Sequence, residues 1–333
     1  MNIYNDYLNT IEAAMKNGSI NESFTGLSNN LRKSFSNNEL LAKTNEKRLL
    51  PSLNELAQEL SLNPNFDQQL GLHPDFSHLK NTGDTENHYI VSVFIDIKGS
   101  TNLFRKYDAE TVFVISNTIQ KAAIHTCLLF GGYIHRLQGD GLFVYFGGKE
   151  SSIEDSVRKS LQCASAFTYF VQNDLKNLFD QQGIEKISTR IGIDLGLEHD
   201  VVWANAGIGE ISEVTTCSLH TSLASKMQAS AESNGIVIGD NIKEHATSIH
   251  DLVTPVCHRT DKETDRYIFE IPHKGFRYTQ YDFSWLKFLK RQDFIATDFN
   301  GNLSLKKRKE TQTRVLDDIA PIAATNKPYF HFL

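Results

Sequence analysis

Residues 89–95 (YIVSVFI) constrain the fold more than any other segment. The run is short, mostly apolar and rich in β-branched residues, which is typical of a strand buried inside a sheet. Asp96 follows directly, and we expect it to end the strand. The next turn contains Gly99 and Ser100, and a helix is expected over about residues 102–130. The sequence therefore predicts a buried strand that delivers a carboxylate to a glycine-containing turn at the start of a helix.

A tight hairpin is predicted shortly after this helix. Gly131 and Gly132 break the chain, and residues 133–138 and 142–146 are expected to be strands around the turn at Asp140. The remaining pattern predicts helices over about residues 153–178 and 218–233, and strands at 189–195, near 201–206, at 235–239 and at 267–271. This mixed order of strands and helices indicates an α/β (α+β) sandwich with a mixed or antiparallel sheet.

Three regions are expected along the chain. Residues 1–87 should form a helical N-terminal extension, because leucines recur at near-helical spacing between residues 50 and 62. The polar breaker NTGDTEN at 81–87 marks its end. The core domain is expected over residues 88–272, followed by a C-terminal extension over 273–333. A chain of 333 residues is long enough for one large domain with such extensions.

The composition argues against several classes of function. A net charge of −6 gives no global electrostatic reason to bind nucleic acid or an anionic membrane. Four cysteines without a C-x-x-C pair match no zinc site, and we expect them to be reduced thiols. The N-terminus lacks the apolar stretch of a signal peptide, and the apolar runs are shorter than the ~20 residues needed to span a bilayer. We therefore expect a soluble, cytoplasmic protein without a membrane span.

Asp96 and Asp140 are the candidate metal ligands, because both come at the ends of strands that should be neighbours. Two carboxylates placed in this way can hold two Mg²⁺ or Mn²⁺ ions, which prefer oxygen ligands and share their remaining positions with phosphates. The backbone carbonyl of Ile97 is a further candidate. A lone aspartate at a strand end is more often a cap, and a lone Gly-Asp-Gly more often only a turn. Their order, spacing and strand context together favour the metal site.

The turn after Asp96 is the candidate phosphate site, and its residues are Lys98, Gly99, Ser100 and Thr101. A turn of glycine and serine that opens a helix offers free backbone N–H groups to a triphosphate. The side chain of Lys98 is ambiguous, because it could bind phosphate or simply be a surface cation.

Four short motifs, in order, carry a resemblance to a known family. They are FIDIKGST (94–101), RLQGD (136–140), GIDLG (192–196) and SLASKM (222–227). This combination resembles the catalytic domain of class III adenylate and guanylate cyclases over about residues 88–272. The resemblance implies a ferredoxin-like sheet core and the conversion of a nucleoside triphosphate to a 3′,5′-cyclic nucleotide and pyrophosphate. It also implies a homodimer, in which one copy supplies Asp96 and Asp140 and the other recognises the base and the transition state.

The motifs depart from the family where specificity is determined. Arg136 stands where the family has a base-reading lysine or glutamate, and Thr215 where it has a second base-reading residue. Ser222 and Lys226 stand where the family has a transition-state asparagine and arginine. They keep a hydrogen-bonding hydroxyl and a positive charge, without the two-pronged geometry of a guanidinium. Arg266 precedes the last predicted strand, where the family often has a basic residue for the terminal phosphates, although a surface arginine is the alternative.

Arg136 favours a pyrimidine base. Its guanidinium only donates hydrogen bonds, so it suits O4 of uracil, with Thr215 as the candidate partner of N3–H. Cytosine could accept at N3 and O2, but its amino group would need another acceptor. The long side chain at position 136 also narrows the pocket toward one ring. We therefore expect UTP rather than CTP, and pyrimidines rather than purines, unless Arg136 turns away or binds phosphate.

The departures resemble one branch in particular, the bacterial pyrimidine cyclases of the Pycsar antiphage systems. The segment HPDFSHL (73–79) is similar to theirs as well. This resemblance implies that cyclic UMP, or cyclic CMP, is made on phage infection and read by a separate effector. A purine cyclase with an unusual pocket and a catalytically inactive cyclase fold are the alternatives. Retention of Asp96 and Asp140 argues against the inactive fold, whereas the changes to Ser222 and Lys226 keep it open.

Overall fold

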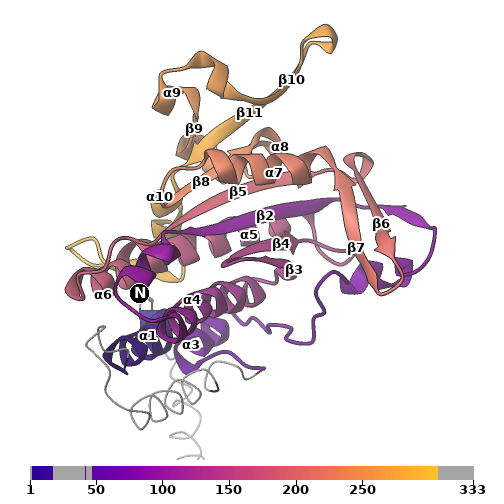
Figure 1. The fold of residues 1–333 in the computed structure, drawn as a ribbon. Helices are drawn as coiled ribbons and strands as arrows, with labels where there is room; N and C mark the ends of the chain where they lie inside the picture. Colours follow the sequence, from indigo (N-terminus) through magenta and orange to yellow (C-terminus); the bar gives the residue numbers. More distant parts are fainter. Residues whose placement is uncertain (1, 18–41, 43–46, 307–333) are drawn as a thin grey trace, which may run out of the picture.

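The centre of the molecule is a sheet in the order β10-β11-β8-β5-β2-β4-β3, with β9 beside β11 (Figure 1). The computed structural model describes residues 2–17, 42 and 47–306. Neighbouring strands are antiparallel except β5 and β8, which are parallel, so the predicted mixed sheet is confirmed. The strands are β2 (Ile90–Lys98), β3 (Tyr133–Gln138), β4 (Gly141–Phe146), β5 (Ser188–Gly196), β8 (Gly235–Gly239), β9 (Val253–Pro255), β10 (Tyr267–Ile271) and β11 (Phe276–Phe283).

The core of this sheet has a ferredoxin-like topology, as the sequence implied. Along the chain β2, α4 (Ala109–Leu129), β3, β4, α5 (Ile153–Tyr169) and β5 follow one another, and in space the strands lie in the order β5-β2-β4-β3. Strand β2 is buried on both faces. Val91, Val93 and Ile95 belong to the core with α4 and α5, whereas Ser92 reaches Thr221 of α7 (Leu219–Ser230). Burial on two faces explains the nearly continuous apolar run of this strand.

The N-terminal extension packs on α4. Its described residues include the helices α1 (Asn5–Asn17) and α3 (Pro51–Glu59), and α3 confirms the predicted leucine-rich helix. Tyr4 Oη lies 2.9 Å from Thr126 Oγ1, and Tyr7 Oη lies 2.5 Å from His125 Nδ1, all in the interior. We expected no apolar stretch long enough to span a bilayer, but α4 is long and apolar enough by length and composition alone. However, 67% of its most apolar stretch is buried inside the fold, as in the core helix of a globular protein.

A second sheet of three strands contains β1 (Thr85–Asn87), β6 (Val201–Ile208) and β7 (Ile211–Ser218), in the order β1-β6-β7. The sequence did not predict β7. Phe76, in the 3₁₀ segment Pro74–Leu79, stacks on Trp203 of β6 with ring centroids 4.0 Å apart. Both belong to an aromatic cluster between this sheet and the central one, formed by His73, Phe76, Phe94, Tyr133, His135, Phe143, Tyr145 and Trp203.

Two predicted helices are interrupted. A 3₁₀ segment, Ser100–Arg105, precedes α4, which begins only where the Asp108 side chain accepts from the Thr111 N–H at 2.9 Å. The helix expected over 153–178 is α5, a π-helical turn at Phe170–Leu175 and α6 (Lys176–Gln181). The other helices and strands are α8 (Asp240–His245), α9 (Cys257–Thr260), α10 (Trp285–Lys290), β12 (Ile295–Thr297) and β13 (Leu303–Leu305).

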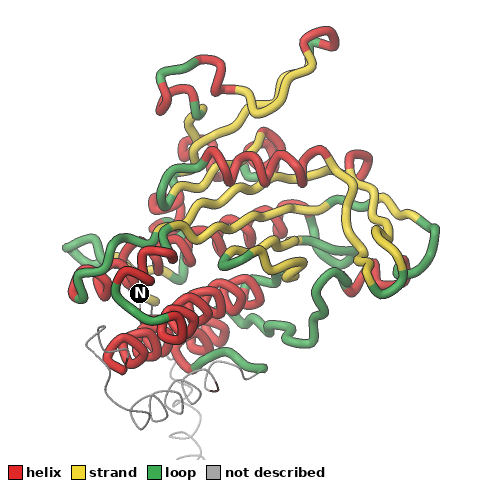
Figure 2. The backbone as a smooth tube through the Cα atoms, viewed as in Figure 1, coloured by secondary structure: helices red, strands yellow, loops and turns green. Residues whose placement is uncertain are grey.

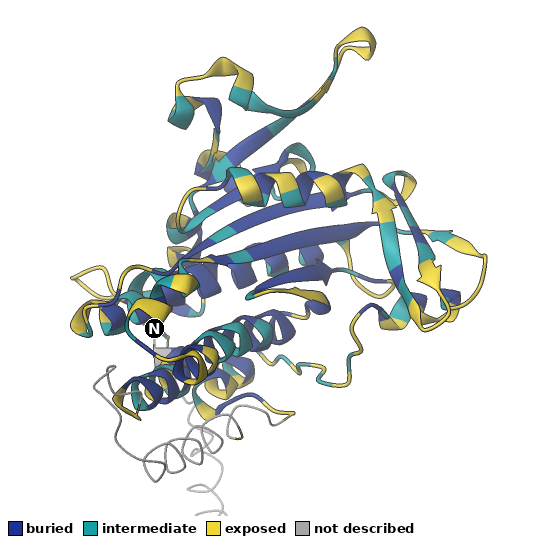
Figure 3. Cartoon of the chain, in the orientation of Figure 1, coloured by how far each residue is buried: buried dark blue, intermediate teal, exposed yellow. Residues whose placement is uncertain are grey.

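The β10–β11 hairpin projects away from the body of the molecule, as Figure 2 shows. Only residues 280–282 of β11 pair with β8, and the part of the hairpin from Tyr267 to Thr279 pairs with itself. The central strands are buried along most of their length, whereas the outer faces of this hairpin and of α7 are exposed (Figure 3).

Candidate active site

The two predicted metal ligands lie on strand β2 and in the turn that precedes the neighbouring strand β4. Asp96 does not end its strand as expected, because residues 96–98 stay paired with β5. Asp140 lies in the two-residue turn between β3 and β4. A Cβ on Gly141 would lie 3.4 Å from Asp96 Cα and only 2.4 Å from the carbonyl oxygen of Ile95. The structure therefore brings Asp96 and Asp140 together, and the close approach requires glycine after Asp140.

Arg190 of β5 holds the Asp96 carboxylate. It lies directly opposite Asp96 in the β2–β5 ladder, and its Nε and Nη2 donate to Asp96 Oδ2 at 3.0 and 2.5 Å. Asp140, in contrast, makes no hydrogen bond or ion pair with any residue that the structure describes. The charge of the Asp96 carboxylate is thus neutralised by Arg190, whereas the Asp140 carboxylate is available to bind a ligand. The sequence analysis did not identify Arg190, because its place opposite Asp96 depends on the register between β2 and β5.

The predicted phosphate turn follows the carboxylates. Gly99 has φ 93°, and a Cβ there would lie 2.7 Å from the carbonyl oxygen of Lys186, so this position requires glycine. Ser100 opens the 3₁₀ segment, whose first N–H groups have no partner within it. Lys98 and Thr101 are exposed and Ser100 is half-buried. The turn therefore offers backbone donors next to the two carboxylates, as its assignment as a phosphate site requires.

Arg136 is paired with a carboxylate that the sequence analysis did not identify. On β3, its Nε donates to Glu213 Oε2 at 2.6 Å, and its Nη2 forms an ion pair with Glu213 Oε1. The Arg136 side chain is 45% exposed and that of Glu213 is 22% exposed. Glu213 lies on β7, the strand that was not predicted. The planar guanidinium of Arg136, a hydrogen-bond donor, therefore lies beside the carboxylate of Glu213, an acceptor.

Thr215 lies next to this pair and is held by buried side chains. His135 Nε2 lies 3.0 Å from Thr215 Oγ1 and 3.8 Å from Glu213 Oε2. Burial, helped by the neighbouring guanidinium of Arg136, lowers the pKa of His135 to about 3, so its ring is neutral at physiological pH. Tyr145 lies 3.5 Å from Thr215 Oγ1. The structure thus brings together both predicted base-reading residues, Arg136 and Thr215, on a rigid support.

Ser222 and Lys226 share the exposed face of α7, one helical turn apart. Ser222 Oγ donates to the carbonyl oxygen of Ser218 at 3.3 Å. The inner face of α7 presses on β5, where a Cβ on Gly192 would lie 2.1 Å from the carbonyl oxygen of Ala224. Within the described chain, no hydrogen bond or ion pair joins Ser222 or Lys226 to Asp96 or Asp140. The two groups of predicted residues therefore form separate sets on one copy of the chain.

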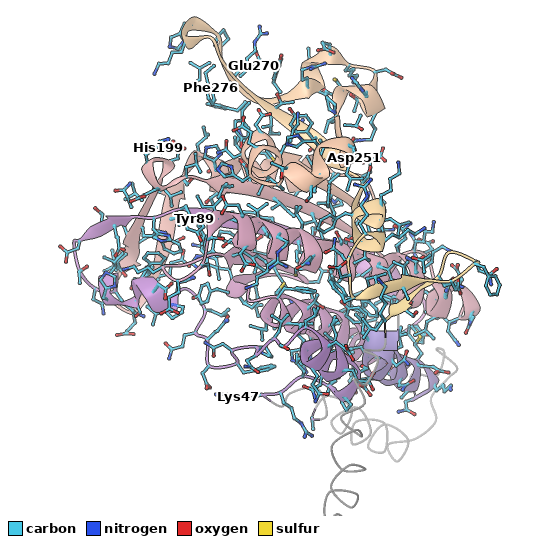
Figure 4. The ribbon with its side chains drawn as sticks, turned by 180° about the vertical axis from the view of Figure 1, so that it is seen from behind. Lys47, Tyr89, His199, Asp251, Glu270 and Phe276 are labelled. Atoms are coloured by element: carbon cyan, nitrogen blue, oxygen red, sulfur yellow. The ribbon has the colours of Figure 1, made fainter. Side chains whose placement is uncertain are left out.

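Arg266 is not brought to the phosphate turn. It lies in the 3₁₀ segment Glu263–Arg266 at the base of the β10–β11 hairpin, where its Nε forms an ion pair with Glu263 Oε1 at 2.6 Å. Figure 4 shows Glu270 and Phe276 on the same hairpin, which projects away from the central sheet. Within one copy of the described chain, Arg266 has the contacts of a surface arginine.

Comparison with known proteins identifies the family. No protein-family model matches the chain. A cytidylate cyclase from Staphylococcus aureus is 38% identical over 255 residues, which cover 75% of this chain and 59% of the relative. A cytidylate cyclase from Escherichia coli is 33% identical over 261 residues, which cover 73% of this chain and 56% of the relative. The chain is a relative of the cytidylate cyclases. The expected resemblance to nucleotidyl cyclases, and to their pyrimidine branch, is thereby confirmed.

The chain spans a little more than half the length of these cytidylate cyclases. Among solved structures, the adenylyl cyclase CyaB from P. aeruginosa aligns with a TM-score of 0.47 and 22% identity, over 60% of this chain and 95% of that one. The guanylyl cyclase Cya2 aligns with a TM-score of 0.46 and 20% identity, over 67% of this chain and 99% of that one.

In this relative of the cytidylate cyclases, the donor set at Asp96 and Asp140 fits Mg²⁺ or Mn²⁺. Two carboxylates, with the Ile97 carbonyl as a further oxygen, suit hard cations and not zinc. In the part of the chain that the structure describes, no group of three or more His, Cys, Asp or Glu side chains could form a closed metal cage. Mg²⁺ usually keeps several waters and takes phosphate oxygens as ligands, so an open set of this size fits it. A cation at Asp96 has to compete with Arg190 for the same oxygen.

A buried pair anchors α7 in this cyclase relative. Asp194 Oδ2 lies 2.9 Å from His220 Nδ1, and Tyr278 Oη donates to Asp194 Oδ1 at 2.7 Å. Burial raises the pKa of the Asp194 carboxyl, partly offset by its hydrogen bond with His220. Burial also opposes charge on His220, but the hydrogen bond and charge of Asp194 outweigh it and raise the pKa of His220. The pair fixes the first turn of α7, so that Ser222 and Lys226 point outward.

Proposed function

We propose that the protein is a nucleotidyl cyclase that converts CTP to 3′,5′-cyclic CMP and pyrophosphate. The cyclase part of the proposal is supported by the adjacent carboxylates of Asp96 and Asp140 beside a glycine turn with free N–H groups. In the reaction the ribose 3′-oxygen bonds to the α-phosphorus, and the bond from that phosphorus to the β-phosphate oxygen breaks. Divalent cations, when bound, activate the attacking oxygen and offset charge on the leaving pyrophosphate.

The protein's own groups hold the substrate for this displacement. The N–H groups after Gly99 bind the phosphates, and Asp96 and Asp140 would hold the cations. Lys226 and Ser222 lie on the exposed face of α7, where they are available to a second copy of the chain. We propose a homodimer, in which Lys226 of one copy offsets the charge that develops on the phosphate held by the other.

The pairing of Arg136 with Glu213 is the observation that carries the choice of base. Cytosine presents acceptors at N3 and O2 and a donor at its amino group, so the guanidinium can donate while the carboxylate accepts. Uracil presents a carbonyl where cytosine has the amino group, and a carboxylate there would face it without a proton. Adenine shares one acceptor and one donor with cytosine but lacks the O2 acceptor. The Arg136–Glu213 pair therefore favours CTP over the UTP that the sequence alone suggested.

UTP stays a prediction that the same experiment tests. Incubation of purified protein with Mn²⁺ and each of ATP, GTP, CTP and UTP, followed by mass spectrometry, identifies the product. Cyclic CMP supports the proposal. Cyclic UMP as the main product would favour Thr215 over Glu213 as the base-reading acceptor, and a cyclic purine would remove the pyrimidine assignment while keeping the chemistry. Absence of all four products would contradict the proposed cyclase.

The biological role proposed for this activity is a signal made on phage infection and read by a separate effector. Its support is the similarity to pyrimidine cyclases. Cells carrying the protein together with its effector should reduce phage plating, and cells carrying Asp140→Asn should not. Equal plating on both strains would exclude the role and leave the enzymatic proposal standing.

A further inference from the structure

A polar cleft of about 570 Å³ lies beside the phosphate turn. It is built where the end of β2 meets the π-helical turn, α6, the start of β5 and the loop after α7. Lys98 and Gly99 of the turn form part of its wall. The other lining residues are Asn102, Gln172, Asn173, Lys176, Asn177, Lys186, Ser188, Ser233 and Asn234.

The lining of this cleft is strongly biased toward hydrogen-bond donors. It contains three lysines, several amides and two serines, and no carboxylate. Lys176 pairs with Asp180 at 2.6 Å, but Lys98 and Lys186 form no ion pair with any residue that the structure describes. The two ammonium groups without an ion pair, those of Lys98 and Lys186, repel each other on one cavity unless an anion is present. The cleft therefore has the charge of an anion site.

The cleft and Asp140 lie on opposite sides of the phosphate turn. Strand β2 lies between β4 and β5, so Asp140 approaches the turn from the β4 side. Lys186 and Ser188 approach from the β5 side, where Ser188 pairs with Lys98 and the Lys186 carbonyl meets Gly99. A phosphate chain held by the turn has Asp140 on one side and lysines on the other.

The amides of the cleft are held in place by the fold. Asn234 accepts from the Thr189 N–H at 3.0 Å, and its carbonyl accepts from Trp285 Nε1 at 2.9 Å. Asn173 lies in the π-helical turn and donates to the Tyr169 carbonyl at 3.2 Å. Such π-helical turns interrupt an α-helix and occur frequently at functional sites. This one places Gln172 and Asn173 on the cleft wall.

We propose that the cleft binds a condensed phosphate. The site itself follows from the lining and charge, whereas the source of the ligand rests on the proposed cyclase function. The ligand is pyrophosphate, either as the β- and γ-phosphates of the bound triphosphate or as the released product. Lys186 and Lys98 contact its charge directly, and the amides donate to its outer oxygens.

Inorganic pyrophosphate in EDTA is the probe, because binding without metal does not depend on turnover. Isothermal titration of the full-length chain should show binding that weakens about tenfold or more in Lys186→Gln, since a charged hydrogen bond is lost. The double variant Lys176→Gln/Lys186→Gln should lose most of it. Lys290→Gln, an exposed lysine on α10, is the charge-matched control and should bind as the wild type does. Equal affinity in all four proteins, or no binding to the wild type, would overturn the proposal.

The source of the phosphate is identified by repeating the titration with Mg²⁺ and 3′-deoxy-CTP, which cannot cyclise. If the terminal phosphates of the substrate occupy the cleft, pyrophosphate binding is blocked. If the cleft holds the released product, pyrophosphate still binds and remains sensitive to Lys186→Gln. If the protein binds pyrophosphate in this way but makes no cyclic nucleotide, the anion site stands and the proposed cyclase function fails. Failure of the anion site and failure of the cyclase function are therefore distinguishable.

Discussion

The two halves of the candidate site are built in different ways. In the metal half, Asp96, Asp140 and the turn at Gly99 are positioned by strand pairing and glycine contacts, and Asp140 has no partner among the described residues. In the base half, Arg136 is held by Glu213, and Thr215 by His135. The metal half is therefore completed by what binds to it, whereas the base half is already organised as a fixed pattern of donor and acceptor. Each of the following substitutions tests that contrast.

Asp140→Asn should have the largest effect. The amide is isosteric but cannot supply the charge that cations require, so turnover should fall on the order of 10³-fold or more, because a bound metal contributes several kcal/mol to such reactions. Stability should hardly change, because the Asp140 side chain makes no hydrogen bond or ion pair with the described residues. Mn²⁺ binding followed by electron paramagnetic resonance and thermal unfolding check both statements. A variant that binds Mn²⁺ and turns over normally would contradict the metal half.

Lys226→Gln should have the next largest effect, about 10²-fold on kcat, because it removes a positive charge that acts on the transition state. Lys226→Arg keeps the charge and should retain most of the activity. KM should change little in both variants, since the loss concerns the transition state rather than substrate binding. Equal activity of the glutamine and arginine variants would remove the electrostatic role.

Glu213→Gln should alter selectivity more than rate. A glutamine amide can donate as well as accept, so the preference for CTP over UTP should narrow by about tenfold, as for loss of one charged hydrogen bond. The matched control is Glu270→Gln on the projecting hairpin, which should leave the preference unchanged. An unchanged preference in Glu213→Gln would show that the base is recognised elsewhere.

Acid should destabilise the base half specifically. Burial lowers the pKa of His73 to about 4, although the charge of Asp75 opposes this shift. Burial also lowers the pKa of His135 to about 3, and the charge of Arg136 adds to this shift. A depressed pKa gives stability that is fully present above the unfolded value of about 6.5 and is lost as the pH falls toward the folded pKa, by roughly 2 kcal/mol per histidine at pH 4.5. Urea unfolding at pH 7 and 4.5 should show this loss, and His135→Gln should reduce it. A pH-independent free energy of unfolding would contradict the buried neutral rings.

Strands with long apolar runs gave the clearest signal in the sequence. Strands β2 and β4 carry such runs, which located Asp96 and Asp140. Strand β7 (ISEVTTCS) is mostly half-exposed and polar, so it gave no such signal and Glu213 went unnoticed. Arg190 was missed for another reason. Its position opposite Asp96 depends on the register between β2 and β5, which a single sequence does not show.

The central claim is that one active site takes its metal half from one copy of the chain and Lys226 from another. Asp140→Asn and Lys226→Gln, each nearly inactive alone, test it when they are co-expressed and cyclic nucleotide formation is measured. In a symmetric dimer about half of the pairs are mixed, and each mixed pair contains one intact site out of two, so activity should recover to about a quarter of the wild-type value. A mixture as inactive as its two components would show that both halves act within a single chain and would contradict the account.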